Sequence, residues 1–222
     1  MKRRFVIRSL WTAPVAALAL TALPAFAQEA AEPAAPEVAE TFATTTVAME
    51  TTAGTIVLAL ETERAPITSA NFLKYADEGR FDGTVFYRTM RLDWGDKVAG
   101  LIQGGTQYDP KRILPPIAHE ATSETGLSHT KGAISMARYE PGSATGDFSI
   151  MATDMTGLDA KPDSENADQK AGFAVFGHVV EGMDVVKAIH AAEVDPDKGE
   201  GFLKGQMLAD PVKIVSVKRI AE

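Results

Sequence analysis

Two short apolar segments carry the polar pair around which the chain is organised. Residues 86–90 read FYRTM and residues 101–105 read LIQGG, and each has the composition typical of a strand. They deliver Arg88 and Gln103. An arginine offers a planar fork of N–H donors and a glutamine offers both a donor and an acceptor, so the pair is suited to gripping a peptide backbone. The polar, glycine-containing segment 91–100 is predicted to connect the two strands.

The first 27 residues have the features of a secretory signal peptide. Basic residues within positions 2–8 precede an apolar segment at 11–23, and Ala25 and Ala27 stand where a signal peptidase requires small side chains. The apolar segment is shorter than the roughly 20 residues of a membrane span. An uncleaved anchor is the alternative. We expect cleavage after Ala27 and export to the periplasm.

The charge balance argues against a nucleic-acid partner. The chain has 22 basic and 30 acidic residues, a net charge of −8, and the predicted signal peptide holds four of the basic ones and none of the acidic ones. The mature chain therefore has a net charge of −12, whereas phosphate binding needs a basic surface. The chain contains no cysteine, which excludes disulfides and a lipid-modified N-terminal cysteine. We expect a soluble mature protein without membrane attachment.

A flexible tether is predicted between the signal peptide and the folded domain. Residues 28–43 are mostly Ala, Pro and Glu, and such a segment buries too little apolar surface to offset the entropy of ordering it. The folded domain is expected to span residues 44–222.

The rest of the chain predicts a mainly-β domain. Besides the two opening segments, short β-prone segments lie at residues 47–50, 55–60, 133–137, 148–151, 173–179 and 212–219. Helical periodicity is present at residues 65–79, where Pro66 is in the first turn and Gly79 at the end, and at residues 183–191. About eight strands with one early and one late helix favour a closed eight-stranded antiparallel β-barrel capped by two α-helices. A β-sandwich is the competing fold, but the two amphipathic helices fit it less well.

Several segments, in a fixed order, resemble the cyclophilin-type peptidyl-prolyl isomerases. The matching segments are residues 65–73, 81–88, 102–105, 132–137 and 176–186. The resemblance covers about residues 44–220, and bacterial members, including exported ones, share this pattern. It implies the barrel fold and an enzyme that accelerates rotation about X-Pro peptide bonds. Rotation neither makes nor breaks a bond, so no cofactor and no metal is expected, and the four histidines show no metal-ligand spacing.

The resemblance also assigns roles to individual residues. Arg88 matches the family's catalytic arginine, which donates to the prolyl nitrogen, and Gln103 matches the glutamine that holds the substrate backbone. The positions that match the family's substrate-binding residues are Tyr87, Leu101, Met136, Ala137, Arg138, Asp147, Phe148, Ser149, Leu158 and Phe173.

Three positions depart from the family's pattern of pocket aromatics. Gly100, Ser149 and Gly157 stand where the family has aromatic side chains. Tyr87 replaces a histidine, which is a milder change because both rings are aromatic and polar. Trp94, in the segment between the two strands, is expected either to fold over the pocket or to pack on the side of the barrel.

Two functions remain open from the sequence. The first is an exported, monomeric isomerase, weakened or altered, that acts on proline-containing polypeptides, chiefly unfolded exported proteins. The second is a non-catalytic module or chaperone that binds proline-containing peptides on the same barrel. Retention of Arg88 and Gln103 favours catalysis, whereas the missing aromatic side chains favour the binding module.

Overall fold

The structure, a computed structural model, describes residues 41–94 and 97–220. The predicted signal peptide and nearly all of the predicted tether lie outside the described residues. The described part begins close to the barrel. The Phe42 ring stacks under the Arg64 guanidinium at 4.7 Å, and the carbonyl of Ala43 accepts hydrogen bonds from the amide of Glu63 and the hydroxyl of Thr62. Contacts with the domain therefore start just before residue 44.

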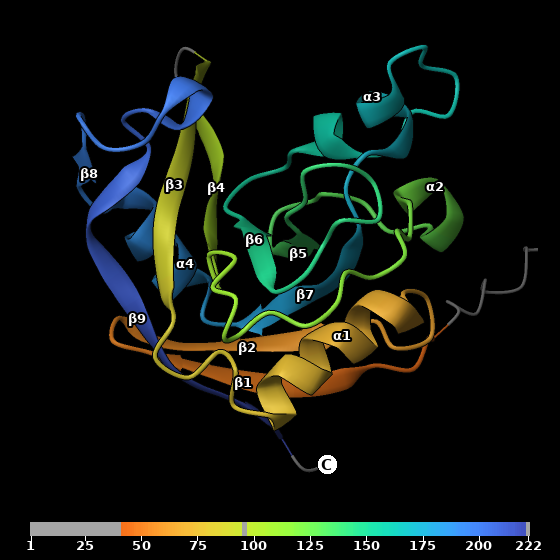
Figure 1. The fold of residues 1–222 in the computed structure, drawn as a ribbon, viewed down its shortest axis with the longest axis horizontal. Helices are drawn as coiled ribbons and strands as arrows, with labels where there is room; N and C mark the ends of the chain where they lie inside the picture. Colours follow the sequence, from red (N-terminus) through yellow and green to blue (C-terminus); the bar gives the residue numbers. More distant parts are fainter. Residues whose placement is uncertain (1–40, 95–96, 221–222) are drawn as a thin grey trace, which may run out of the picture. The chain divides into compact units, whose positions relative to one another are not determined.

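Eight antiparallel strands close into a barrel (Figure 1). Around the barrel they follow the order β1 (Thr45–Thr51), β2 (Gly54–Leu60), β7 (Val175–Glu181), β5 (Ala133–Met136), β6 (Asp147–Met151), β4 (Lys97–Gly105), β3 (Val85–Trp94) and β9 (Met207–Arg219), and β9 then pairs with β1. A short ninth strand, β8 (Val194–Asp195), pairs with β9 outside the ring. The closed barrel predicted from the sequence is confirmed.

Two longer helices and several short turns complete the domain. The helices are α1 (Pro66–Asp77) and α4 (Met183–Ala191), close to the predicted ranges, and the short elements are α2 (Thr122–Thr125), α3 (Ala167–Ala171), η1 (Thr156–Leu158) and η2 (Gly201–Leu203). The short elements were not predicted, because three to five residues are too few to show helical periodicity. In the part of the chain that the structure describes, no helix has the length and hydrophobicity needed to cross a membrane.

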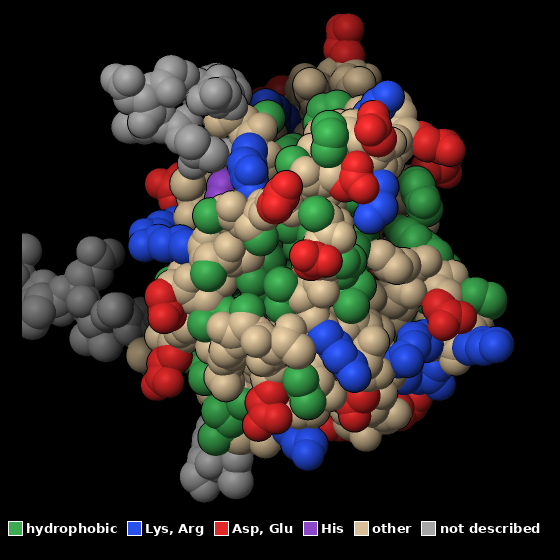
Figure 2. Space-filling view, turned by 90° about the vertical axis from the view of Figure 1, so that its left-hand side faces the viewer, with side chains coloured by type: hydrophobic (Ala, Val, Ile, Leu, Met, Phe, Trp, Pro, Cys, Tyr) green, Lys and Arg blue, Asp and Glu red, His purple; other side chains and the backbone are tan. Residues whose placement is uncertain are grey.

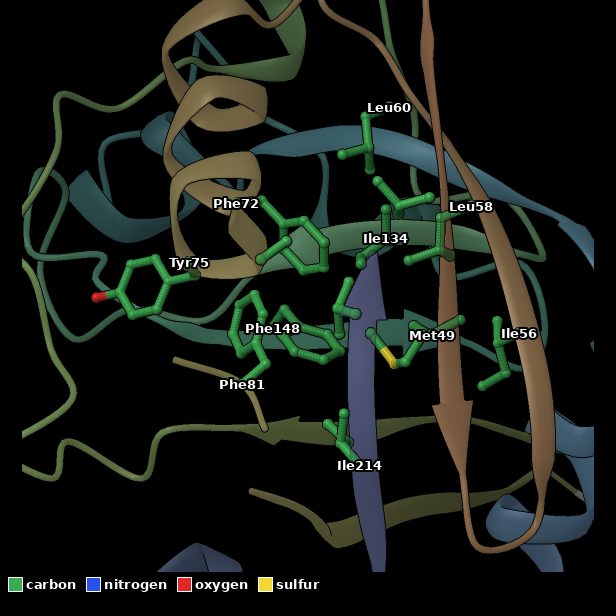
Figure 3. Close-up of a cluster of buried hydrophobic side chains, with 14 of the residues drawn as sticks. Met49, Ile56, Leu58, Leu60, Phe72, Tyr75, Phe81, Ile134, Phe148 and Ile214 are labelled. Carbon is green, nitrogen blue, oxygen red and sulfur yellow. The ribbon is translucent and has the colours of Figure 1, made fainter. Parts of the chain in front are cut away.

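Aromatic side chains fill the barrel interior (Figure 3). Phe72 from α1 lies 4.8 Å from the ring of Phe81 and 5.4 Å from that of Phe148, measured between centroids. Aliphatic side chains from the strands, including Leu58 and Ile134, pack around them. Each buried phenylalanine contributes about 1.5–3 kcal/mol relative to an exposed one. The packed interior gives the strands that carry the pocket a rigid support.

The segment between the two opening strands is a hairpin extension, so the prediction of a simple connection at residues 91–100 was wrong. Strand β3 continues to Trp94 and β4 starts at Lys97, with Arg91 paired to Gly100. Polar residues read as a loop in sequence, but antiparallel strands also tolerate them, because one face of such a pair can lie in solvent. The side chain of Trp94, expected near the pocket or on the barrel side, lies outside the described residues.

Candidate active site

A pocket of about 280 Å³ opens on the outer face of the barrel, over strands β3, β4, β6 and β5. Its lining consists of Arg88, Met90, Leu101, Gln103, Ser135, Met136, Ala137, Arg138, Ser149, Met151, Leu158, Phe173 and Phe202. The structure thus brings together Arg88 and Gln103 and most of the predicted substrate-binding residues. The side chains of Tyr87, Asp147 and Phe148 are not part of this lining.

The alternation of side chains along a strand decides which residues face the pocket. On β4, Leu101 and Gln103 line the pocket while Ile102 between them is in the barrel core. On β6, Ser149 lines the pocket, whereas Phe148 is fully buried in the core. Phe148, predicted to bind substrate, therefore stabilises the barrel from inside.

A bulge at Tyr87 turns Arg88 toward the pocket. Regular alternation would place residues 86 and 88 on the same face of β3. The register shifts between Phe86 and Arg88 in the pairing of β3 with both β4 and β9. A bulge adds one residue to a strand and resets which face the following residues occupy. As a result, Phe86 lies in the core, while Arg88 and Met90 line the pocket.

Tyr87 and Asp147 form a structural pair beneath the neighbouring turn. The Tyr87 hydroxyl donates to Asp147 Oδ1 at 3.2 Å, and the same carboxylate accepts from the amides of Gln107 and Tyr108. Both of those residues have positive φ angles, which the carboxylate helps to hold. Burial raises the pKa of Asp147, and these hydrogen bonds oppose that shift. The pair fixes the turn after β4 and does not reach the pocket.

Two glutamines hold the Arg88 guanidinium. Its Nη1 donates to Gln103 Oε1 at 2.6 Å. Its Nε and Nη2 both donate to Gln206 Oε1, at 2.9 and 2.7 Å. Three of the five N–H groups of the guanidinium are used in this way, which leaves one on Nη1 and one on Nη2 for a ligand. The side chain is therefore fixed in position but keeps donors to offer.

Burial and charge set the strength of those donors. Desolvation lowers the pKa of Arg88 from its usual value, but an arginine guanidinium stays protonated in proteins. A partly buried cation is less screened by water, so a hydrogen bond from it is stronger than one from an exposed arginine.

Flexible apolar side chains form the floor of the pocket. Met90, Leu101 and Met151 belong to a small buried cluster that lies apart from the barrel core, and Leu158 packs against it. Methionine side chains adapt their shape to a ligand more readily than aromatic rings do. The floor offers an apolar surface suited to a small ring.

A hydrogen-bonded chain fixes one wall of the pocket. Asp159 accepts from His129 Nδ1 at 2.5 Å, and His129 Nε2 is 2.9 Å from Ser135 Oγ, which lines the pocket. Burial lowers the pKa of His129, although the hydrogen bond to Asp159 opposes this. The ring is neutral and donates from Nδ1, so Nε2 accepts the Ser135 hydroxyl proton. Ser135 is thereby held in one orientation.

Sequence reasoning missed five residues of the site. Strand periodicity could have found Met90, Ser135 and Met151, because each lies two residues from a predicted pocket residue on the same strand face. Phe202 and Gln206 had no such signal. They lie in the connection between β8 and β9, more than 100 residues after Arg88 in sequence.

Comparison with known proteins assigns the chain to a family. A family model described as "Cyclophilin type peptidyl-prolyl cis-trans isomerase/CLD" matches residues 46–219. The chain belongs to the cyclophilin-type peptidyl-prolyl cis-trans isomerases. Bacterial relatives agree with this assignment. A peptidyl-prolyl cis-trans isomerase of Streptomyces antibioticus is 38% identical over 177 residues, which is 78% of this chain and 97% of the relative. One from Acinetobacter baylyi is 37% identical over 184 residues, 81% of this chain and 88% of the relative.

Solved cyclophilin structures share the fold of this cyclophilin. A cyclophilin-type isomerase of Cryptosporidium parvum superposes with a TM-score of 0.62 at 18% identity, over 81% of this chain and 99% of the other. A second structure of that protein was determined in the presence of the dipeptide Ala-Pro. At this level of identity the similarity concerns the barrel alone.

Two of the missing aromatic side chains have different structural explanations in this cyclophilin. At Gly100, a side chain would overlap the carbonyl oxygen of Met90 and come within 2.6 Å of His190 Nε2, so the paired hairpin requires a glycine. At Gly157, an added Cβ meets nothing within 4 Å, so the position is open. The hairpin therefore leaves no room for an aromatic side chain at position 100, whereas position 157 has room for one but is a glycine.

Proposed function

We propose that this cyclophilin isomerises X-Pro bonds in unfolded exported polypeptides, with Arg88 as the catalytic donor and Gln103 as a substrate-backbone contact. The observation that carries this proposal is the guanidinium of Arg88, held by three hydrogen bonds beside an apolar pocket, with two N–H groups still available.

The reaction needs a donor at the prolyl nitrogen. Planar amide resonance gives a barrier of about 18–20 kcal/mol, and the uncatalysed reaction takes tens to hundreds of seconds. A hydrogen bond to the nitrogen lone pair stabilises the twisted state, in which resonance is lost, more than either planar state. Only such differential stabilisation accelerates the reaction, and an acceleration on the order of 10⁵ requires about 7 kcal/mol. A preorganised guanidinium contributes without reorganising during the reaction.

The pocket supplies the remaining contacts. The proline ring fits the floor formed by Met90, Leu101 and Met151, next to Leu158. The Oε1 atom of Gln103 is occupied by Arg88, so its amide N–H groups are turned to donate to a substrate carbonyl. The structure of the Cryptosporidium parvum relative in the presence of Ala-Pro supports a proline-containing ligand for this chain as well.

Exchange spectroscopy on a proline peptide tests the catalytic role of Arg88. The wild-type protein should cause exchange between the cis and trans NMR signals of a short X-Pro peptide. Replacing Arg88 by alanine should lower kcat/KM by roughly 100- to 1000-fold, the effect of removing one preorganised donor. Arg64→Ala is the matched control, because Arg64 also pairs with a polar side chain and an aromatic ring but is not part of the pocket lining. Chemical-shift changes without exchange would instead identify a non-catalytic binding module.

The cellular part of the proposal depends on the N-terminal segment. The basic residues, apolar segment and small residues before Gln28 support export to the periplasm. We propose that the mature protein is a soluble monomer there. Mass spectrometry of the protein recovered from a periplasmic fraction should give a mature chain that starts at Gln28, and light scattering should give the monomer mass. An intact N-terminus in the membrane fraction would contradict cleavage after Ala27 and indicate an uncleaved anchor.

A further inference from the structure

The connection between β8 and β9 lies at the mouth of the pocket, far from Arg88 and Gln103 in sequence. It covers residues 196–206 and contains η2 (Gly201–Leu203). Figure 1 shows this short turn beside the upper part of β3, on the far side of the hairpin from β6 and α3. Phe202 of η2 lines the pocket although its side chain is 73% exposed.

The side chain of Gln206 joins this connection to Arg88. Its Oε1 accepts two hydrogen bonds from the guanidinium, and its Nε2 donates to the backbone carbonyl of Phe202 at 2.7 Å. The Phe202 ring lies over the guanidinium, with 5.9 Å between the ring centroid and Arg88 Cζ. One amide group thus fixes both the arginine and the backbone that carries the ring.

Folding alone does not account for the position of this ring. A phenylalanine stabilises a fold when its side chain is removed from water, but most of the surface of Phe202 stays exposed to water. A cation–π contact at an exposed site contributes little. The ring does, however, lie on the rim of the pocket, so a polypeptide bound in the pocket would cover the ring.

We propose that Phe202 is a specificity-determining residue that contacts the side chain next to the proline of the bound polypeptide and favours a bulky apolar residue there. The inference rests on the proposed function, since it takes the pocket as the proline site. With the proline ring on the methionine-rich floor, the adjacent residue of an extended chain reaches the rim, because successive Cα atoms are about 3.8 Å apart. Phe202 supplies an aromatic contact there.

A peptide series tests this inference. Four Ala-Xaa-Pro-Phe peptides with Xaa as alanine, glutamine, leucine or phenylalanine are compared for kcat/KM and, by NMR titration, for Kd. The wild-type protein should prefer leucine and phenylalanine over alanine and glutamine by roughly 10-fold, the order of effect of one or two buried methylene groups. Phe202→Ala should abolish this preference, so that kcat/KM on the leucine and phenylalanine peptides falls by roughly 10-fold relative to kcat/KM on the alanine peptide. Phe202→Trp should keep the preference.

The control is Phe42→Ala, which removes another partly exposed phenylalanine that stacks on an arginine but is not part of the pocket lining. It should keep the wild-type preference. If wild type is active and Phe202→Ala shows the same preference as wild type, the inference is overturned while the proposed function stands. If wild type accelerates no peptide, the proposed function fails, and the Kd series still decides the inference: equal Kd values for wild type and Phe202→Ala across the four peptides would overturn it.

Discussion

Arg88 shows how a single side chain depends on residues that no local motif contains. Gln103 is its paired residue on β4, and the two face the same pocket. Gln206 arrives from the other side, from a connection between two later strands, and accepts two of the three hydrogen bonds that the guanidinium makes. A guanidinium that is already fixed by hydrogen bonds on two sides loses less conformational entropy when it binds a ligand. The arginine is therefore preorganised by tertiary contacts as much as by its own strand.

Two glycines that replace pocket aromatics should respond to substitution in opposite ways. Gly157→Trp adds a ring at an open, exposed position, so it should lower KM for a proline peptide severalfold and leave the free energy of unfolding within about 0.5 kcal/mol. Gly100→Ala places a methyl group against the Met90 carbonyl, so it should destabilise the protein by about 1–3 kcal/mol, as overpacking does. Urea unfolding and steady-state kinetics measure both effects. A stable, fully active Gly100→Ala variant would contradict the hairpin geometry.

At the scale of elements, helix α4 braces the hairpin that carries the site. The carbonyl of His190, in the last turn of α4, accepts hydrogen bonds from the Thr89 hydroxyl at 3.1 Å and from Arg91 Nε at 2.8 Å. Arg91 Nη2 also donates to the carbonyl of Ala192. A cation at a helix C-terminus is favourable because the last carbonyls have no partner within the helix. The helix thus holds the strand on which Arg88 and Met90 lie.

Removing this brace should loosen the hairpin and weaken catalysis. Arg91→Ala should destabilise the protein by about 1 kcal/mol, since it leaves the helix carbonyls without their charged donor. Amides of β3 and β4 beyond Arg88 should exchange hydrogen faster, while those of β1 and β2 should not change. We expect kcat to fall severalfold because Arg88 lies three residues away on the same strand. Arg91→Lys should restore part of both effects. Unchanged exchange in the hairpin would show that α4 does not brace it.

At the scale of the whole molecule, acidic residues outnumber basic ones, and side chains of both signs are mixed on the face that Figure 2 shows. Figure 2 views the domain from the side of β8 and β9, where apolar side chains gather in the middle and acidic and basic side chains alternate around them. On this face, among the residues described, no broad area of basic side chains is present. This agrees with the net negative charge of the chain.

Two buried histidines, His129 and His190, have lowered pKa values and make stability depend on pH. Because burial lowers the pKa of His129, the unfolded chain takes up a proton near the ordinary value of about 6.5 while the folded protein resists it. Stability contributed by the neutral ring is full above about pH 6.5 and is lost as the pH falls through the folded pKa. The pKa of Asp159 is also lowered, so its contribution is lost at more acidic pH. The pKa of Asp147 is raised, so protonation of Asp147 in the acidic range favours the folded protein and opposes the loss of stability from His129 and Asp159.

Unfolding experiments between about pH 7.5 and 5 test His129 by comparing the wild-type protein with a variant, because His190, whose pKa is also lowered, and Asp147, whose pKa is raised, are present in both. The free energy of unfolding of the wild-type protein should decrease as the pH falls. His129→Gln keeps hydrogen-bonding groups near Ser135 and Asp159 but has no titrating ring, so its stability should vary less over the same range. Equal slopes for the two proteins would contradict a buried neutral His129.

Much of the architecture follows from local sequence patterns. Alternating apolar residues predicted most of the strands, and the periodicity of residues 65–79 and 183–191 predicted the two main helices. The motifs around Arg88 and Gln103 led to the family and to a pair that the structure places at 2.6 Å. Strand β9 was predicted only from residue 212, because Pro211 reads as a strand break, although the strand begins at Met207.

What the sequence by itself determined is therefore most of the barrel strands, the two longer helices, the family and the residues that the family motifs name, since each of these depends on neighbours along the chain. The tertiary structure decided which of those residues face the pocket. The bulge at Tyr87 turns Arg88 outward, and Phe148 and Asp147 point away from the pocket. The tertiary structure also brought Phe202 and Gln206 to Arg88, because closure of the barrel pairs strand β9 with β3. Contacts between residues so far apart in sequence leave no periodic trace in it, and only the packed barrel fixes them.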